Sequence, residues 1–476
     1  MLFIHNALKR INVYLPYTNS WIMLAASVPV ALATGTLFVY SVYNTQLADK
    51  CNLDASQTAN LNISATLGTA LGGLLSGVVT DKYGTQMPIL FSCLTISLGY
   101  RWVYMLYMMP GAPYILIQLL VAMFLVGLGS VSGYFSCLKA IVLEFPNFRS
   151  SAQSVTIASF AISSLLYLTI SSKLFNGDTG RFLYFLHVSC GLMLFIGFLF
   201  IRVEGHHDKV QLEETEPLLT SEESPAPITL RPSVTRLKAL GIKETLESPI
   251  FWYHYAMFAI MQGLGQMYIY SVGYVLKAVH YAYSKEETAT SDPSLQSLQV
   301  LHVSLIAIFS FVGRLLSGPQ SDYLVRVLKS QRHWIVILGT SLMLAGHLLN
   351  TMPLLQITND LHKANIILLV VSCLIGYAYG FSFASFPAIV ADLFNMKNYS
   401  FIWGVMYTST TFGLTLMTKL FGAVYDWQSN DWDAELGKYV CAKGSGCYRL
   451  TFEITSGLCV LVIVLMLGYI RYSRSI

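Results

Sequence analysis

A short motif occurs twice in this chain, about half the chain length apart. Residues 74–81 read LLSGVVTD, and residues 315–322 read LLSGPQSD. The two copies end at Asp81 and Asp322, which lie 241 positions apart (322 − 81) in a chain of 476 residues. Each copy stands where a long apolar stretch ends in charged residues. The repeat therefore indicates two similar halves.

The composition restricts what these halves can be. The chain is 54% hydrophobic and 11% charged, against about 25% charged residues in an ordinary soluble domain. A water-soluble protein could not hide this much apolar surface, so most of it is expected to face lipid. The net charge is only +4, and there is no basic tract with interleaved aromatics, which argues against a nucleic-acid partner. The sequence has no zinc-type spacing and no phosphate-binding glycine loop. We therefore expect no metal and no cofactor.

Apolar stretches of about 20 residues, enough to cross a bilayer, occur twelve times. A long polar segment separates the sixth from the seventh. The pattern predicts an all-α membrane protein of twelve transmembrane helices, arranged as two six-helix pseudo-repeats. Duplicated halves are typical of secondary transporters, whose substrate binds where the halves meet. The predicted spans are 20–44, 57–79, 87–108, 114–138, 151–173, 182–202, 250–277, 297–318, 334–353, 364–390, 400–423 and 450–470.

The positions of Lys and Arg predict the orientation of the chain. An even number of spans places both termini on one side, and that side carries 16 basic residues against 8 on the other. Because basic residues favour the cytosol, both termini are predicted to be cytosolic. The expected organisation is a cytosolic tail, a six-helix bundle, a cytosolic and largely disordered linker, a second bundle and a tail, at 1–19, 20–202, 203–249, 250–470 and 471–476.

The linker also carries a candidate sorting signal. It is acidic and rich in proline, a composition that favours disorder. Within it, Glu214, Leu218 and Leu219 resemble an acidic dileucine signal. Such signals direct proteins to vacuoles or lysosomes through sorting adaptors. The resemblance favours a vacuolar or lysosomal membrane over the plasma membrane.

The first copy of the repeat resembles the loop-2 motif of the major facilitator superfamily, here Gly77-x3-Asp81-Lys82-x-Gly84. Gly77 would let a neighbouring helix approach closely, and Gly84 would allow a tight turn. Asp81 would hold basic groups or helix N-termini on neighbouring segments. The motif implies a gate on the cytosolic side, completed by Arg149 and by the second copy at Gly318 and Asp322.

Four shorter patterns resemble the nodulin-like transporters of plants and fungi, which are related to the monocarboxylate transporters. They are FPNFR at 145–149, GRLLSG at 313–318, GAVYD at 422–426 and CxxxxxCYR at 441–449. By this resemblance Arg314 is a carboxylate ligand. The alternative is that Arg314 extends from a helix end to lipid phosphate. The family's partner aspartate is replaced by Ser310, and its span-one lysine is absent.

Ionisable residues are distributed unevenly in the spans. Acidic residues fall at span ends, whereas basic residues enter the spans at Arg101, Lys139, Lys277, Arg314 and Lys419. A charge inside a membrane costs at least about 2.5 kcal/mol and usually marks function or a pairing. This pattern suits an anionic substrate. Proton coupling is left to histidine, for which His187 and His302 are the candidates. For Lys139, Lys277 and Lys419 the alternative is again extension to the membrane surface.

In the superfamily, spans one, four, seven and ten line the central cavity. The resemblance therefore implies a set of polar substrate ligands on these spans: Tyr40, Gln118, Tyr134, Gln262, Gln266, Tyr270, Tyr377 and Tyr379. Gln262 and Gln266 are one turn apart and share a helix face. For any single residue of the set, a hydrogen bond between helices is the alternative role.

Taken together, these features predict a membrane transporter of a small organic solute that works by alternating access. We expect an organic anion such as a monocarboxylate. The alternatives are an amino-acid transporter of the vacuolar membrane and a nutrient sensor that does not transport. An enzyme is not expected, because no set of nucleophile, base and orienting residue is visible. Cys441 and Cys447, in the last non-cytosolic loop, are candidates for a disulfide.

Overall fold

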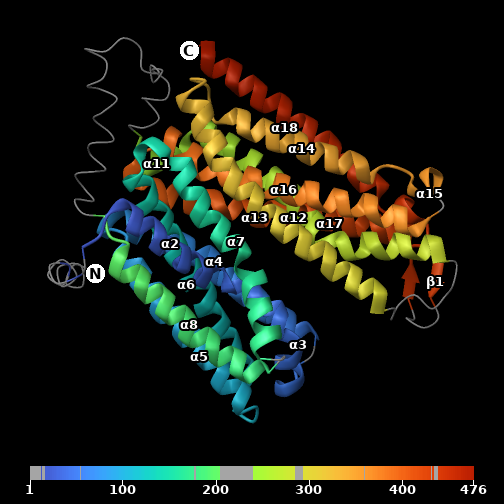
Figure 1. Cartoon of the computed structure of the whole chain (residues 1–476), viewed down its shortest axis with the longest axis horizontal. Coiled ribbons are helices and arrows are strands. Elements are labelled where there is room, and N and C mark those ends of the chain that lie inside the picture. Colours follow the sequence, from blue (N-terminus) through green and yellow to red (C-terminus); the bar gives the residue numbers. More distant parts are fainter. Residues whose placement is uncertain are drawn as a thin grey trace. The chain divides into compact units, whose positions relative to one another are not determined.

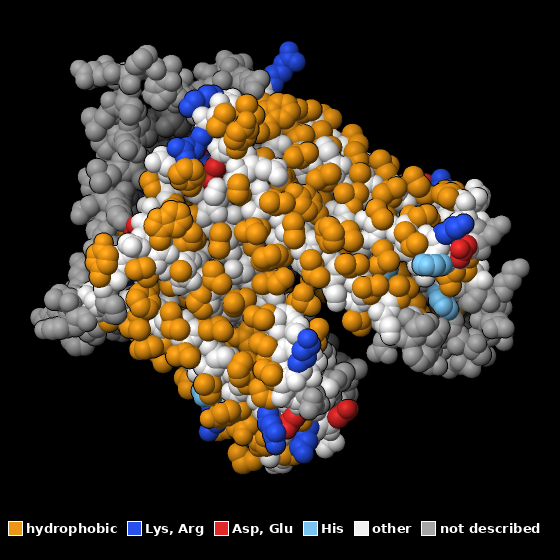
Figure 2. Space-filling view, in the orientation of Figure 1, with side chains coloured by type: hydrophobic (Ala, Val, Ile, Leu, Met, Phe, Trp, Pro, Cys, Tyr) orange, Lys and Arg blue, Asp and Glu red, His pale blue; other side chains and the backbone are white. Residues whose placement is uncertain are grey.

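The computed structural model describes residues 12, 15, 17–53, 55–175, 178–203, 240–284, 293–358, 360–429, 431–433 and 438–475. Long helices dominate, and their sides are covered by hydrophobic side chains in the face shown in Figure 2, where charged side chains gather near helix ends. Within these ranges, ten helices are long and apolar enough to cross a membrane. The candidate sorting signal at Glu214, Leu218 and Leu219 lies outside the described residues.

Each predicted span after the first corresponds to one long helix. The first half contains α2 Ser20–Thr34, η1 Gly35–Val39, α3 Tyr40–Cys51, α4 Ala55–Tyr83, α5 Gln86–Met108, α6 Ile115–Glu144, η2 Pro146–Phe148, α7 Arg149–Leu174 and α8 Thr179–Phe200. The second contains α11 Ile242–Glu247, α12 Pro249–Ser284, α13 Pro293–Arg326, α14 His333–Asn350, α15 Leu354–Ile357, α16 Leu361–Leu393, η3 Met396–Asn398, α17 Tyr399–Gln428 and α18 Arg449–Ser475.

The chain forms two compact units that divide between α8 and α12, with one exception. The first unit is Met1–Glu247 together with Pro387–Tyr407, and the second is Ser248–Phe386 together with Thr408–Ile476. The end of α16 and the start of α17 therefore belong to the first unit. The sequence alone predicts a single boundary in the linker and gives no sign of this exchange.

In the first unit, α4 packs on α6, and α5 packs on both α6 and α8 (Figure 1). The core is formed by fully buried hydrophobic side chains from α2, α5, α6 and α8, such as Val30, Ile89, Tyr100, Val126 and Leu194. Burial of each such side chain contributes about 1.5–3 kcal/mol relative to exposure in water. In the membrane, close packing of the interior holds the helices together.

The first predicted span, 20–44, is not one continuous helix. A 3-10 turn, η1, interrupts it between α2 and α3. Side chains of neighbouring helices supply donors to the carbonyl oxygens near the break: the Ser163 and Ser130 hydroxyls bond to Leu32 and Thr34, and the Tyr100 hydroxyl bonds to Thr36 at 3.0 Å. These bonds satisfy backbone groups that a broken helix would otherwise leave without partners in lipid.

In the second unit, α14 packs on α18 (Figure 1), and α12 packs on α13 and α18. Its core includes Tyr268, Val272, Ile375 and Phe452. A short two-stranded antiparallel ribbon, β1 Asp431–Asp433 with β2 Lys438–Val440, precedes α18; Trp432 pairs with Tyr439. The 3-10 turn η4 Gly444–Cys447 follows the ribbon.

Candidate functional site

The guanidinium of Arg314 lies over two aromatic rings inside the second unit. Its central carbon is 5.5 Å from the ring centre of Tyr379 and 4.4 Å from that of Phe383, both on α16. Arg314 is 6% exposed, and α13 continues for twelve residues beyond it, to Arg326, or about 18 Å of helix. The position favours a buried cation–π contact over extension to the membrane surface.

Two glutamine side chains of α12 belong to the same region. Gln266 donates from its side-chain amide to the Tyr379 hydroxyl at 3.2 Å. One turn earlier, Gln262 is completely buried, and neither of its amide atoms has a hydrogen-bond partner within the described part of the chain. One turn earlier again, the Phe258 ring lies 5.9 Å from that of Phe383. Gln262 therefore lies on α12 between Phe258 and Gln266. These two residues contact Phe383 and Tyr379, the two rings under the Arg314 guanidinium.

We call this group the arginine cluster: Gln262, Gln266, Arg314, Tyr379 and Phe383. It combines a permanent positive charge with the Gln262 amide, whose donor and acceptor have no partner among the residues that the structure describes. A buried polar group without a partner costs about 1–3 kcal/mol, so such a group is retained where a ligand or water satisfies it. A guanidinium binds a carboxylate through two parallel hydrogen bonds. The cluster has the chemistry of a site for a small anion.

The predicted ligands on the N-terminal half are not brought together in this way. The Tyr40 hydroxyl donates to the backbone carbonyl of Thr58 at 2.8 Å, a contact between α3 and α4. Gln118 donates to the Pro113 carbonyl at the start of α6 and accepts from the indole of Trp102. These bonds fit the alternative role, a contact that fixes neighbouring segments.

Three further tyrosines of the predicted set have different surroundings. Tyr134 is buried and stacks on Phe160 with ring centres 4.3 Å apart. Tyr270 is 59% exposed on α12. Tyr377 stacks on Phe381 with ring centres 5.5 Å apart.

Asp81 forms the centre of the first gating motif. Its carboxylate accepts a hydrogen bond from the Lys139 ammonium at 2.6 Å, and Lys139 is completely buried. It also accepts from the backbone N–H groups of Ser400 at 3.1 Å and Phe401 at 2.9 Å, in the first turn of α17. One carboxylate therefore neutralises a buried cation and caps a helix N-terminus, where the helix dipole favours negative charge.

The glycines of this motif have two different structural roles. A Cβ atom on Gly77 would stand 2.8 Å from backbone atoms of both Ser400 and Phe401. Gly77 thus allows the start of α17 to approach α4. Gly84 has φ +90° in the turn after α4, a conformation that side-chain-bearing residues rarely adopt.

Two basic residues near the motif form ion pairs. Arg149, predicted as a partner of Asp81 in the gate, pairs with Asp392 at 3.6 Å. For Lys139 the sequence left open a pairing or an extension to the membrane surface, and the structure shows the pairing, with Asp81. Both Lys139 and Asp81 lie about five residues or fewer from the ends of their helices. That matching depth was the signal in the sequence that could have identified the pair.

The second copy of the motif makes a different set of contacts. Asp322 accepts a hydrogen bond from the Arg332 guanidinium at 2.7 Å, and the same guanidinium nitrogen bonds to Ser321 at 2.9 Å. Gly318 is buried on α13, one turn before Asp322. In the first copy, Lys82 is exposed, with its ammonium 5.5 Å from the centre of the Tyr83 ring.

The histidines named as proton-coupling candidates lie in different settings. The His187 ring contacts both the hydroxyl and the carbonyl oxygen of Ser97 at 2.9 Å and is half-buried. His302 is completely buried; its Nδ1 lies 2.7 Å from the Ser372 hydroxyl, which in turn lies 2.8 Å from the Tyr268 hydroxyl. Nε2 of His302 has no hydrogen-bond partner among the described residues.

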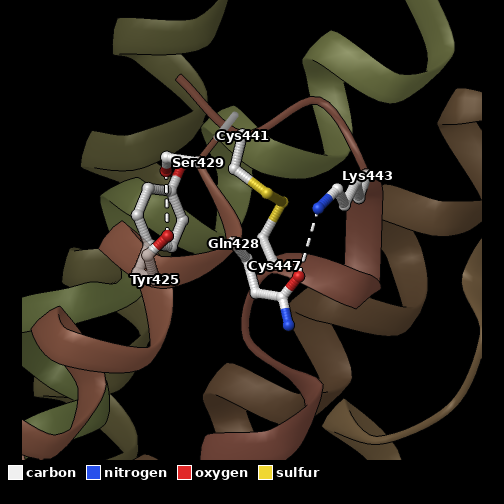
Figure 3. The surroundings of a disulfide bond; sticks show 6 residues. All are labelled: Tyr425, Gln428, Ser429, Cys441, Lys443 and Cys447. Carbon is white, nitrogen blue, oxygen red and sulfur yellow. Dashed lines mark hydrogen bonds between the residues drawn. A yellow bond between two sulfur atoms is a disulfide. The ribbon is translucent and has the colours of Figure 1, made fainter. Parts of the chain in front are cut away.

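Cys441, directly after β2, and Cys447, the last residue of η4, form a disulfide with Cα atoms 5.9 Å apart (Figure 3). The Lys443 ammonium, between them in sequence, donates to the Gln428 side chain at 3.2 Å. The neighbouring Tyr448 is fully buried, and burial raises the pKa of its phenol. The disulfide and the buried Tyr448 side chain hold the segment that leads into α18.

These features define a multi-pass helical membrane protein with two related halves and a family-specific gating motif. The sequence matches the family model "Major Facilitator Superfamily" over residues 19–328 and 292–475. The chain belongs to this superfamily, whose members are transporters rather than enzymes.

Relatives of similar length agree with this assignment. An uncharacterized membrane protein of Saccharomyces cerevisiae, YMR155W, is 27% identical, with 93% of each chain covered. A probable transporter of Yarrowia lipolytica, MCH1, is 24% identical, with 91% of this chain and 88% of the relative covered. An uncharacterized MFS-type transporter of Escherichia coli, YhjX, is 22% identical, with 81% and 84% covered.

Solved structures confirm the fold. The proton:xylose symporter XylE superposes with a TM-score of 0.63 at 13% identity, covering 95% of this chain and 96% of XylE. FucP, described in an outward conformation, gives a TM-score of 0.54 at 13% identity, with 93% and 98% covered. The predicted fold class is therefore confirmed.

Proposed function

We propose that this superfamily member carries small organic anions, such as monocarboxylates, and that Arg314 binds their carboxylate. The observation that carries the proposal is the position of Arg314, buried over Tyr379 and Phe383. Aromatic faces stabilise a buried guanidinium, and its positive charge suits an anionic substrate. A substrate carboxylate would form two parallel hydrogen bonds with the guanidinium.

The amide of Gln262 supports a substrate with a second polar group. It can donate one hydrogen bond and accept another, and both capacities are unused within the described residues. A hydroxy acid would satisfy it, and so would an amino acid. The amino-acid alternative rests on this amide. A sensor that does not transport is less well supported, because the predicted linker, 203–249, is short and has a composition that favours disorder.

The gate follows from the contacts of Asp81. In this proposal the carboxylate holds the start of α17 against α4 in one state of the transport cycle and releases it in the other. His302 is the proposed site of proton coupling, through the chain of hydrogen bonds to Ser372 and Tyr268. We further propose a vacuolar or lysosomal location, directed by the dileucine-like residues of the linker.

Uptake into proteoliposomes tests the proposal. Purified protein would be screened with labelled carboxylates and amino acids, with and without a pH gradient. Arg314→Gln should abolish uptake of the transported class. Arg314→Lys should retain only part of it, because an ammonium keeps the charge but loses the planar pair of donors.

Arg101→Gln provides a matched control. Arg101 also lies near two aromatic rings, at 5.4 Å from that of Tyr104 and 5.9 Å from that of Tyr184, but in the first unit. Its loss should leave uptake close to wild type. Uptake of neutral solutes alone, unaffected by Arg314→Gln, would contradict the anion proposal. Selective uptake of amino acids would favour the alternative.

A further inference from the structure

The Tyr379 ring, over which the Arg314 guanidinium lies, also contacts two consecutive residues of α12. The side-chain amide of Gln266 donates to the Tyr379 hydroxyl at 3.2 Å. The preceding residue is Gly265, and a Cβ atom added there would stand 2.5 Å from Cδ2 of the ring and 2.9 Å from the Tyr379 Cβ atom. The ring therefore packs on α12 at its base and is bonded to α12 at its hydroxyl.

These two contacts restrict opposite movements of the ring. The close packing at Gly265 prevents the ring from moving toward α12, whereas the bond to Gln266 resists movement away from it. Tyr379 is 8% exposed, so little open space surrounds it. A side chain that is packed and bonded in this way is held in one of its rotamers. The two residues of α12 thus determine the orientation of the Tyr379 ring.

The guanidinium reaches this ring because α13 and α16 approach closely. Gly313 directly precedes Arg314, and a Cβ atom there would overlap the backbone carbonyl oxygen of Tyr377 and stand 3.0 Å from the backbone nitrogen of Phe381. These two residues lie on either side of Tyr379 in α16. The backbones that carry the cation and the ring are therefore in direct contact. What the backbones leave undetermined is the orientation of the side chains, and for Tyr379 it comes from α12.

The orientation of the ring matters to the cation because the attraction acts over the ring face. It operates within about 6 Å of the ring centre. The Arg314 guanidinium carbon lies 5.5 Å from the centre of the Tyr379 ring, near that limit, and 4.4 Å from that of Phe383. A small displacement of the Tyr379 ring would end its contact with the cation. The guanidinium would then be less well placed for two parallel hydrogen bonds to a carboxylate.

We infer that Gly265 and Gln266 are positioning residues of the anion site: they hold the Tyr379 ring, and through it the guanidinium that binds the substrate carboxylate. The inference rests on the proposed function and goes further, because it makes the affinity of the site depend on α12. It also changes the predicted role of Gln266. The sequence indicated a direct substrate ligand, whereas here the Gln266 amide acts on the substrate through Tyr379.

The concentration dependence of uptake into proteoliposomes tests this inference. Gln266→Leu removes the donor to the Tyr379 hydroxyl, so KM for the transported carboxylate should rise several-fold while the maximal rate changes little. Tyr379→Phe keeps the ring and removes the other partner of the bond, so it should raise KM to the same extent. The combined variant should resemble either single one, because both substitutions remove the same bond.

Gly265→Ala tests the packing at the base of the ring. The added methyl group would displace the ring itself, so KM should rise by more than in Gln266→Leu. Gly273→Ala on the same helix is the matched control. Its added atom would meet only the side-chain end of Gln299, at 3.0 Å, and this exposed side chain can move aside. KM should then equal that of the wild type. If Gly265→Ala does not fold, the variants of the hydrogen bond decide alone.

Two results would overturn the inference. Additive effects of Gln266→Leu and Tyr379→Phe on KM would show that Gln266 contacts the substrate itself, and an unchanged KM in Gln266→Leu would show that the bond does not affect the site. A wild-type protein that carries no organic anion would contradict the proposed function instead. The melting temperatures of the two single variants and the combined one then test the contact: shifts that are less than additive support a held ring, and additive shifts overturn it.

Discussion

The two copies of the repeated motif end in the same residue but use it differently. Asp81 contacts residues far away in the sequence: Lys139 is 58 positions on, and Ser400 and Phe401 are 319 and 320 positions on. Asp322 contacts Arg332, only 10 positions on. The first carboxylate connects distant segments of the first unit, whereas the second closes the turn that follows its own helix.

The difference follows from where basic residues are available. The turn after Asp322 carries Arg332, close enough to take the carboxylate. The turn after Asp81 has Thr85 and Gln86 where the superfamily motif usually has a basic pair. Gln86 instead exchanges two hydrogen bonds with the Asn12 side chain, at 2.8 and 2.9 Å. Asp81 is therefore left to Lys139 and to the first turn of α17. A duplicated motif can thus keep its sequence and change its partners.

Removing the charge of Asp81 should give the largest effect. In Asp81→Asn the ammonium of Lys139 stays buried without its counter-charge, which typically costs about 3–5 kcal/mol. The apparent melting temperature of the detergent-solubilised protein would measure the loss. Lys139→Met in the same chain should restore much of it, since replacing both partners of a buried pair removes the uncompensated charge. An Asp81→Asn protein as stable as wild type would show that the pair does not support the fold.

The matching change in the second copy should be milder. Asp322→Asn removes one charge-assisted hydrogen bond, worth about 1.5–3 kcal/mol. Arg332 keeps its bond to Ser321 and stands at a turn, where its long side chain can move toward water. The same melting measurement should place this variant between wild type and Asp81→Asn. An equal or greater loss than that of Asp81→Asn would contradict the proposed difference between the copies.

Gly77 tests the distant contacts of the first copy by shape rather than charge. A methyl group there would stand 2.8 Å from backbone atoms of Ser400 and Phe401, so the start of α17 must shift. We expect Gly77→Ala to cost on the order of 1–2 kcal/mol, as overpacking does. Gly422→Ala, on α17 with no neighbour within 4 Å of the added atom, is the control and should be neutral or slightly stabilising.

The sequence was sufficient for the fold but only partly for the site. Apolar stretches identify the long helices, because each must satisfy its own backbone in lipid. The repeat identifies Asp81 and Asp322 as equivalent. It could not show their partners, which depend on the depth and rotation of neighbouring helices. For Lys139 the sequence left extension to the membrane surface open as an alternative, and it offered Arg149 as the partner of Asp81.

The arginine cluster and the contact between His254 and His333 illustrate the same limit. Arg314 was recognised through family resemblance, but its setting over Tyr379 and Phe383 depends on how α13 packs against α16. His254 and His333 are 79 positions apart, on helices that no local pattern associates. Their contact depends on how the helices of the second unit pack together. No short sequence pattern predicts that packing.

The smallest expected effect concerns the turns after the two copies. The first turn uses Gly84 at φ +90°, whereas the second has Lys329 at φ +50° in the left-handed region. A residue with a Cβ atom pays roughly 1–2 kcal/mol for that conformation, while glycine adopts it freely but loses more entropy on folding. Lys329→Gly should therefore stabilise the protein by less than about 1 kcal/mol, a small rise in melting temperature. Lys329→Ala, which keeps the Cβ atom, should give no such rise. If both variants melted alike, backbone strain would not distinguish the two turns, and their difference would reduce to the choice of partner for Asp81 and Asp322.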